Sequence, residues 1–127
     1  MNAKLWPRGS GYFWTTLGMA RYRAGDWKGA TQALEEALKL SQATRGFDRS
    51  VGRSLFFLAM AQKQLGQGQE ARQAYDRALT WLETNRKTVQ ETPRLADEVR
   101  RSQTEAEQLL KQRPDQKQKP PAEAPRR

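Results

Sequence analysis

The hydrophobic and polar positions of this chain follow a pattern that occurs twice. In the first copy, small or apolar residues stand at Trp14, Leu17, Gly18, Met19, Ala20, Gly25, Ala30, Leu34, Ala37 and Leu38. The second copy has like residues 41 positions later, at Leu55, Leu58, Ala59, Met60, Ala61, Gly66, Ala71, Tyr75, Ala78 and Leu79. Such a period is typical of stacked repeat proteins, because one unit alone cannot bury its apolar face. The pattern therefore predicts two copies of one structural unit.

Each unit is predicted to be a helical hairpin. Apolar residues recur three or four positions apart on both sides of a glycine, which is the spacing of one helix face. Gly25 and Gly66 are expected to adopt the left-handed conformation that ends a helix and turns the chain. Small residues at Gly18, Ala30 and Ala59 would let the paired helices approach closely.

The two units resemble the tetratricopeptide repeat. The signature positions of that repeat coincide with Trp14, Leu17, Gly18, Gly25, Asp26, Ala30, Ala37 and Leu38 over residues 11–44. Residues 52–85 match less fully, at Leu55, Leu58, Ala59, Gly66, Ala71, Tyr75 and Ala78. The period of 41 residues exceeds the usual 34 or so, and the closing proline is replaced by Gln42 and Glu83. The extra residues predict either a prolonged second helix or a loop between the repeats, which we place at 45–51.

The resemblance implies an all-α fold, a tetratricopeptide-like array of two helical hairpins plus a C-terminal capping helix. The cap is predicted at 92–112, where Thr92 and Pro93 read as an N-cap and first helical residue before an apolar stripe. Residues 113–127 are predicted to form a disordered, basic, proline-rich tail. Residues 1–10 are interpreted as the remnant of a preceding repeat, so the chain is either the end of a longer array or a small protein descended from one.

The helical segments between about residues 11 and 111 also resemble the C-terminal repeat regions of large planctomycete-type proteins. Those proteins carry serine/threonine kinase or β-propeller domains upstream. The resemblance implies an interaction or regulatory module, and the chain itself has no kinase motif.

The composition argues against an enzyme. The chain has no histidine and no cysteine, which removes the usual general base, the thiolate nucleophile and nearly all zinc sites. Pairs such as Glu35 and Lys39 have the spacing of surface ion pairs on a helix. We expect no catalytic residues, no metal and no cofactor. No apolar run is long enough for a signal peptide or membrane span, so we expect a cytoplasmic protein without a membrane partner.

The net charge favours an acidic partner. Lys and Arg number 23 against 14 acidic residues, a net charge of +9. The basic residues are scattered over all the helices and form no recognised nucleic-acid motif. We therefore favour a protein or peptide partner, with a basic nucleic-acid-associating protein as the alternative.

The resemblance also implies a binding groove lined by the first helix of each hairpin. The matching residues are Tyr12, Thr16, Met19, Tyr22, Arg23, Arg53, Phe56, Phe57, Met60 and Lys63. Aromatic rings and methionines beside cations suit an extended peptide that is both acidic and hydrophobic. The alternative is that Met19, Phe57 and Met60 belong to the core, which is common for such residues at helical spacing.

A second contact surface is predicted where the first repeat begins. Phe13, Trp14 and Leu17 lie on the first helix, and the unit that would cover them is missing. Exposed apolar patches often mark contact sites, so we expect self-association as a homodimer through these residues.

Overall fold

The computed structural model describes residues 11–43 and 47–112. These form six helices and no strand: α1 (Gly11–Arg23), α2 (Trp27–Gln42), α3 (Val51–Gln64), α4 (Gly68–Thr84), α5 (Arg86–Gln90) and α6 (Pro93–Leu110). The all-α fold predicted from the sequence is confirmed. The predicted repeat remnant at 1–10 and the predicted tail at 113–127 lie outside the described residues.

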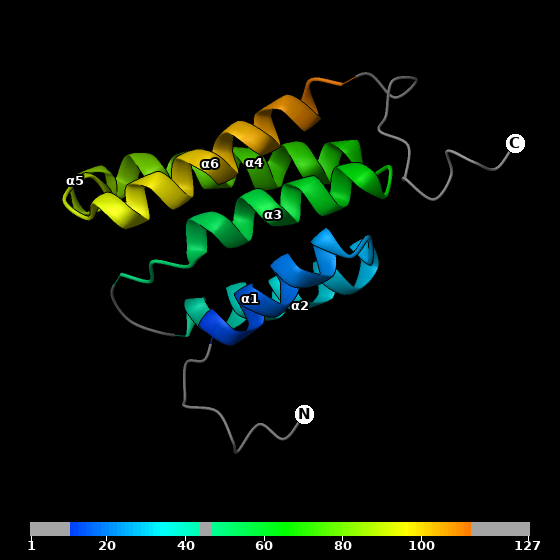
Figure 1. Ribbon diagram of the computed structural model, residues 1–127, viewed down its shortest axis with the longest axis horizontal. Helices are drawn as coiled ribbons and strands as arrows, with labels where there is room; N and C mark the ends of the chain where they lie inside the picture. Colours follow the sequence, from blue (N-terminus) through cyan, green and yellow to red (C-terminus); the bar gives the residue numbers. More distant parts are fainter. Residues whose placement is uncertain (1–10, 44–46, 113–127) are drawn as a thin grey trace, which may run out of the picture.

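The helices form two hairpins, α1 with α2 and α3 with α4, followed by α5 and α6 (Figure 1). The hairpins stack chiefly through α2 and α3. Helix α3 lies between the first hairpin and α6, and 11 of its 14 residues are buried. The core of the molecule therefore surrounds α3.

Both hairpin turns depend on a glycine in the left-handed region. The φ angle is 85° at Gly25 and 84° at Gly66, a conformation that other residues adopt only with strain. The same hydrogen bonds close the two turns, because the N–H of Asp26 donates to the carbonyl of Arg21 and the N–H of Gln67 to that of Gln62. These two glycines do what the sequence predicted.

Gly18 allows α1 and α2 to approach closely. A Cβ atom at Gly18 would lie 2.5 Å from Cγ of Leu34, a side chain that is fully buried. The small residues Ala30, Ala59 and Ala71 are also completely buried. The predicted role of small residues in helix contact is therefore confirmed.

The two hairpins are also joined by a buried hydrogen bond. The hydroxyl groups of Thr15 in α1 and Ser54 in α3 lie 2.7 Å apart, and both residues are almost completely inaccessible to solvent. A buried hydroxyl without a partner is costly. This pair therefore fixes how α1 and α3 lie against each other.

Helix α2 ends at Gln42 and α3 begins at Val51, and the predicted loop at 45–51 lies partly outside the described residues. Within this loop, the ring of Phe47 stacks on Trp81 of α4 with ring centroids 5.7 Å apart. Asp48 accepts hydrogen bonds from the backbone and side chain of Ser50, just before α3. Helix α2 thus ends before the predicted loop, and that loop itself stays a prediction.

Helix α5 was not predicted. It is a single turn after Asn85, and its Val89 is buried next to α6. Helix α6 then begins at Pro93, preceded by Thr92 as the N-cap residue. The Thr92 hydroxyl donates to the carbonyl of Thr88 instead of capping α6.

Helix α6 does not pack on the second hairpin in the way that α3 packs on the first hairpin. Helix α3 packs mainly on α2 and less on α1, whereas α6 packs mainly on α3 and only slightly on α4. Helix α6 therefore covers the first helix of the second hairpin. We call the side formed by α1 and α3, on which α6 lies, the α1/α3 face.

Replacing Gly18 with alanine tests the close contact between α1 and α2. The added methyl group overlaps Leu34, and overpacking costs about 1–3 kcal/mol, which exceeds the gain of about 1 kcal/mol in helix propensity. We expect a net loss of up to about 2 kcal/mol in chemical denaturation. The matched control is Gly68→Ala at the exposed start of α4, where a Cβ atom meets nothing within 4 Å. It should lose nothing, and equal losses in both variants would contradict the assignment.

Candidate functional site

The predicted groove residues on α1 are mostly exposed. Tyr12 is 66% exposed, Thr16 and Arg23 are also exposed, and Met19 is half-buried. Tyr22 is buried, and its ring meets that of Phe57 edge to face, with centroids 5.6 Å apart. Helix α1 therefore offers an open stripe of polar, aromatic and cationic side chains.

The predicted groove residues on α3 are placed differently. Phe56 and Met60 are completely buried and Phe57 is 4% exposed. Phe56 packs against Tyr75 of α4, with ring centroids 5.6 Å apart, and α6 lies over α3. As a correction to the groove derived from the sequence, these three side chains belong to the core. While α6 stays in place, a partner cannot touch them.

Helix α6 and the residue Gln112 that follows it engage the three cations of the predicted groove. Arg23 donates two hydrogen bonds to Glu105, of 2.5 and 2.8 Å. Arg53 lies 3.6 Å from a carboxylate oxygen of Glu98. Lys63 donates a hydrogen bond of 2.9 Å to the backbone carbonyl of Gln112, which follows α6. The cationic side chains of the α1/α3 face are thus held by two carboxylates and one backbone carbonyl from a later segment of the same chain.

The Arg23 guanidinium combines several interactions. It lies over the rings of Phe57 and Tyr22, 5.1 and 5.7 Å from their centroids. The hydrogen bond to Glu105 raises the pKa of Arg23, and burial raises the pKa of Tyr22. This site suits a carboxylate, because the guanidinium binds both carboxylate oxygens in a fixed geometry.

The attachment of α6 depends mainly on its apolar stripe. Leu95, Val99 and Leu109 are buried on α6, together with the small residues Ser102 and Ala106. Burial of one large apolar side chain contributes about 1.5–3 kcal/mol. An exposed ion pair contributes only about 0–1 kcal/mol, and the Arg23 and Glu105 side chains are 57% and 38% exposed. The ion pairs therefore orient α6 more than they hold it.

Exchanging the charges of Arg23 and Glu105 tests this pairing. We expect Arg23→Glu to speed hydrogen exchange of the α6 amides by up to about five-fold, the effect of losing about 1 kcal/mol. The double variant Arg23→Glu with Glu105→Arg should restore most of the protection. Lys39→Glu is the control, since Lys39 pairs only within α2. A double variant no better protected than the single one would show that the pair contributes nothing.

The residues predicted for self-association lie on α1. Phe13, Trp14 and Leu17 are half-buried, and the rings of Phe13 and Trp14 meet edge to face with centroids 5.3 Å apart. They form a partly open apolar surface.

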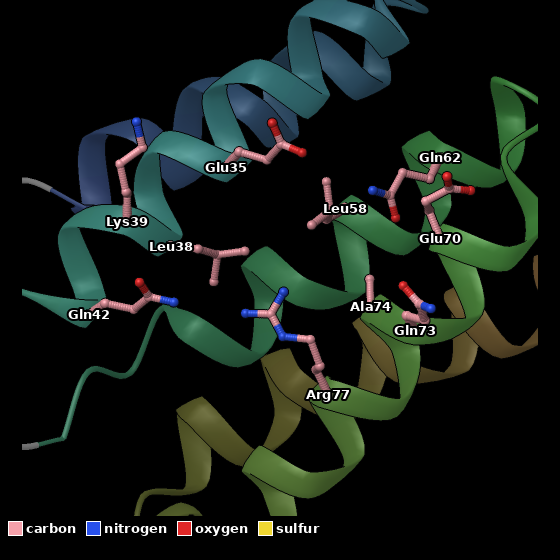
Figure 2. Close-up of a pocket in the computed structure, with 10 residues that line it drawn as sticks. All are labelled: Glu35, Leu38, Lys39, Gln42, Leu58, Gln62, Glu70, Gln73, Ala74 and Arg77. Atoms are coloured by element: carbon pink, nitrogen blue, oxygen red, sulfur yellow. The ribbon is translucent and has the colours of Figure 1, made fainter.

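A cleft between α2 and α4 was not found from the sequence. It has a volume of about 270 Å³ and is lined by Glu35, Leu38, Lys39, Gln42, Leu58, Gln62, Glu70, Gln73, Ala74 and Arg77. Figure 2 shows the carboxylate of Glu35 and the amide of Gln62 directed into the cleft from one end, with the Arg77 guanidinium directed into its middle. A neighbouring hollow of about 290 Å³ shares Leu38, Gln42 and Arg77 and extends to Trp81. The lining carries both signs of charge, so the cleft has no preference for an acidic segment. Polar residues on the second helices were the only signal for it.

The described residues offer neither a metal-binding cluster nor a membrane span. Within 11–43 and 47–112, no cluster of three or more acidic, histidine or cysteine residues could hold a metal ion. None of the helices in these two ranges has the length and apolar character needed to span a bilayer.

Comparison with known proteins identifies a repeat family. The family described as tetratricopeptide repeat matches residues 12–83, more than half of the chain. The matched region covers both hairpins and ends just before α5 and α6. No curated protein and no solved structure matches the chain.

Proposed function

The chain belongs to the tetratricopeptide repeat family, and on that basis we propose that it binds an acidic and hydrophobic segment of a partner protein on its α1/α3 face. Tetratricopeptide repeats are generally protein–protein interaction modules and form a non-enzymatic family. The observation that carries the proposal is the seating of α6, whose Glu98 and Glu105 engage Arg53 and Arg23. The face thus has the chemistry that an acidic segment requires.

The open part of the face supplies the first contacts. Tyr12 and Thr16 are exposed on α1, on the same side of the helix as Arg23. An exposed tyrosine ring provides contact area at low entropic cost, and an arginine orients a carboxylate. We propose that Tyr12, Thr16, Met19 and Arg23 contact the partner directly. Tyr22 supports this surface from beneath through its contact with Phe57.

The distribution of charge favours a protein partner over a nucleic acid. Seven ion pairs occur among the described residues, and they engage Arg23, Lys39, Arg53, Arg86, Arg100, Arg101 and Lys111. Arg23 and Arg53 pair with carboxylates of the distant helix α6, whereas each of the other five cations pairs with a carboxylate three or four residues away in the sequence. The surface is therefore better suited to a few directed contacts than to a polyanion.

Quantitative affinity capture from cells of the source organism tests the proposed function. The full chain should enrich at least one protein, and the variant Tyr12→Ala with Thr16→Glu should reduce that enrichment about ten-fold or more, because it removes an aromatic contact and repels an acidic segment. Both side chains are exposed, so helicity measured by circular dichroism should not change.

The matched control places its changes in the α2/α4 cleft, as Gln73→Glu with Arg77→Ala. This variant should retain the partner. If only the cleft variant lost the partner, the binding site would be the α2/α4 cleft, and the proposed binding on the α1/α3 face would be contradicted. Enrichment that disappears after nuclease treatment would instead support the nucleic-acid alternative.

We also propose that the chain self-associates through Phe13, Trp14 and Leu17. A two-fold dimer would bury the same apolar side chains on both copies. In sedimentation velocity, the wild-type chain should form dimers as its concentration rises. Trp14→Glu should shift the chain to monomer. The control Leu79→Glu, which changes an exposed side chain of α4, should leave the dimer unchanged. A wild-type chain that remains monomeric at high micromolar concentration would contradict this.

A further inference from the structure

We infer that the segment bound by the α1/α3 face is an acidic amphipathic helix, and that it binds by taking the place of α6. This inference rests on the proposed function and adds two things to it. It assigns the partner segment a helical conformation, and it makes α6 an intramolecular competitor that a partner must displace.

The first argument is the place that α6 occupies. A helix that continued the repeat would pack mainly on α4, as α3 packs mainly on α2, yet α6 packs mainly on α3. It lies beyond the region matched by the family, which ends at residue 83. Helix α6 thus lies on the first helix of the second hairpin, on the face where the bound segment is proposed to lie.

The second argument is the match of charge and spacing. Glu98 and Glu105 are seven residues apart, so they lie two helical turns apart on one side of α6. They meet Arg53 from α3 and Arg23 from α1. Beyond the end of α6, the backbone carbonyl of Gln112 accepts a hydrogen bond from the Lys63 ammonium group. A helix with two carboxylates at this spacing is therefore the ligand that these cations fit.

The third argument is the modest apolar contact of α6. Its buried stripe has large side chains at Leu95, Val99 and Leu109, with Ser102 and Ala106 between them, and the partly buried Leu110 also packs against the core. The Ser102 hydroxyl bonds to the carbonyl of Glu98 in its own helix. A partner helix with a comparable apolar stripe therefore competes with α6 for the same surface.

The salt bridge between Arg53 and Glu98 shows where α6 is a poor fit. The Arg53 side chain is only 13% exposed. Its Nε and one Glu98 oxygen are buried without a hydrogen-bond partner, although the two groups lie 3.6 Å apart. Buried polar groups are usually fully paired. A partner carboxylate that approached Arg53 within hydrogen-bond distance would form the hydrogen bond that Glu98 of α6 does not form.

The experiment uses the full chain and, as the probe, a labelled synthetic peptide of residues 92–112. In the wild-type chain the resident α6 competes, so the probe should bind weakly. Val99 is 2% exposed, and Val99→Asp should release α6 by placing a charge in its buried stripe. We expect this variant to bind the probe at least about ten-fold more tightly, because the competent state becomes more populated.

Two charge variants of the probe test the recognition. The peptide with Glu98→Lys and Glu105→Lys should lose binding to the Val99→Asp chain. The matched control peptide carries Asp97→Lys and Glu107→Lys, whose carboxylates pair only within α6. It has the same net charge and should retain binding. Equal binding by both peptides would overturn the assignment of Glu98 and Glu105.

Hydrogen exchange of the Val99→Asp chain separates release of α6 from unfolding. Protection should fall in α6 and persist in α1 to α4, and loss of protection throughout would overturn the inference, because α6 would then be inseparable from the fold. If the wild-type chain formed a dimer and Val99→Asp dissociated it, the helix bound on the α1/α3 face would be α6 of a second copy. That result would overturn the inference of a separate partner. Failure of the probe to bind would overturn the exchange model and leave the proposed function intact, since affinity capture tests that function independently.

Discussion

The burial of α3 is the constraint on which the rest of this structure depends. Most of its residues are buried, because α1 and α2 pack on it from one side and α4 and α6 from the others. Phe56 and Met60 at its centre are completely inaccessible. Helix α3 is apolar over most of its surface, and such helices are buried in folded proteins. The second hairpin covers one side only, and the need to cover a further side is met by α6.

This requirement gives α6 two roles. It covers the apolar side of α3 that the hairpins leave open. Through Glu98 and Glu105 it also pairs with Arg53 and Arg23, the cations that the face presents. The first role depends on apolar area and the second on geometry. A partner segment able to supply both kinds of contact is chemically equivalent to α6, and this links the architecture to the proposed function.

The sequence was most informative where one residue type has a single structural explanation. Gly25 and Gly66 predicted the two turns, because only glycine adopts their conformation without strain. Gly18 predicted a close helix contact, because a side chain there would overlap Leu34. Thr92 and Pro93 predicted where α6 begins. These signals are local, and they do not depend on how distant elements pack.

The sequence was least informative about α3. Leu55 to Ala61 is an uninterrupted run of apolar residues, so its periodicity cannot tell a groove-facing position from a buried one. The family resemblance assigned Phe56, Phe57 and Met60 to an open groove, but α6 covers them. Helix α5 is one turn long and has no periodicity to detect. The α2/α4 cleft combines residues far apart in the chain, so only the packed structure reveals it.

The buried pair of Thr15 and Ser54 has a consequence for how binding acts on the two hairpins. Their hydroxyl groups form a buried hydrogen bond between α1 and α3, the two helices that form the α1/α3 face. Because the contact is polar and buried, sliding α1 along α3 would break it and leave both groups unsatisfied. The hydrogen bond therefore opposes relative movement of the two hairpins. Arg23 and Arg53 lie on the two helices that this bond joins. In the proposed exchange, this constraint on the two cations favours a partner whose carboxylates lie two helical turns apart.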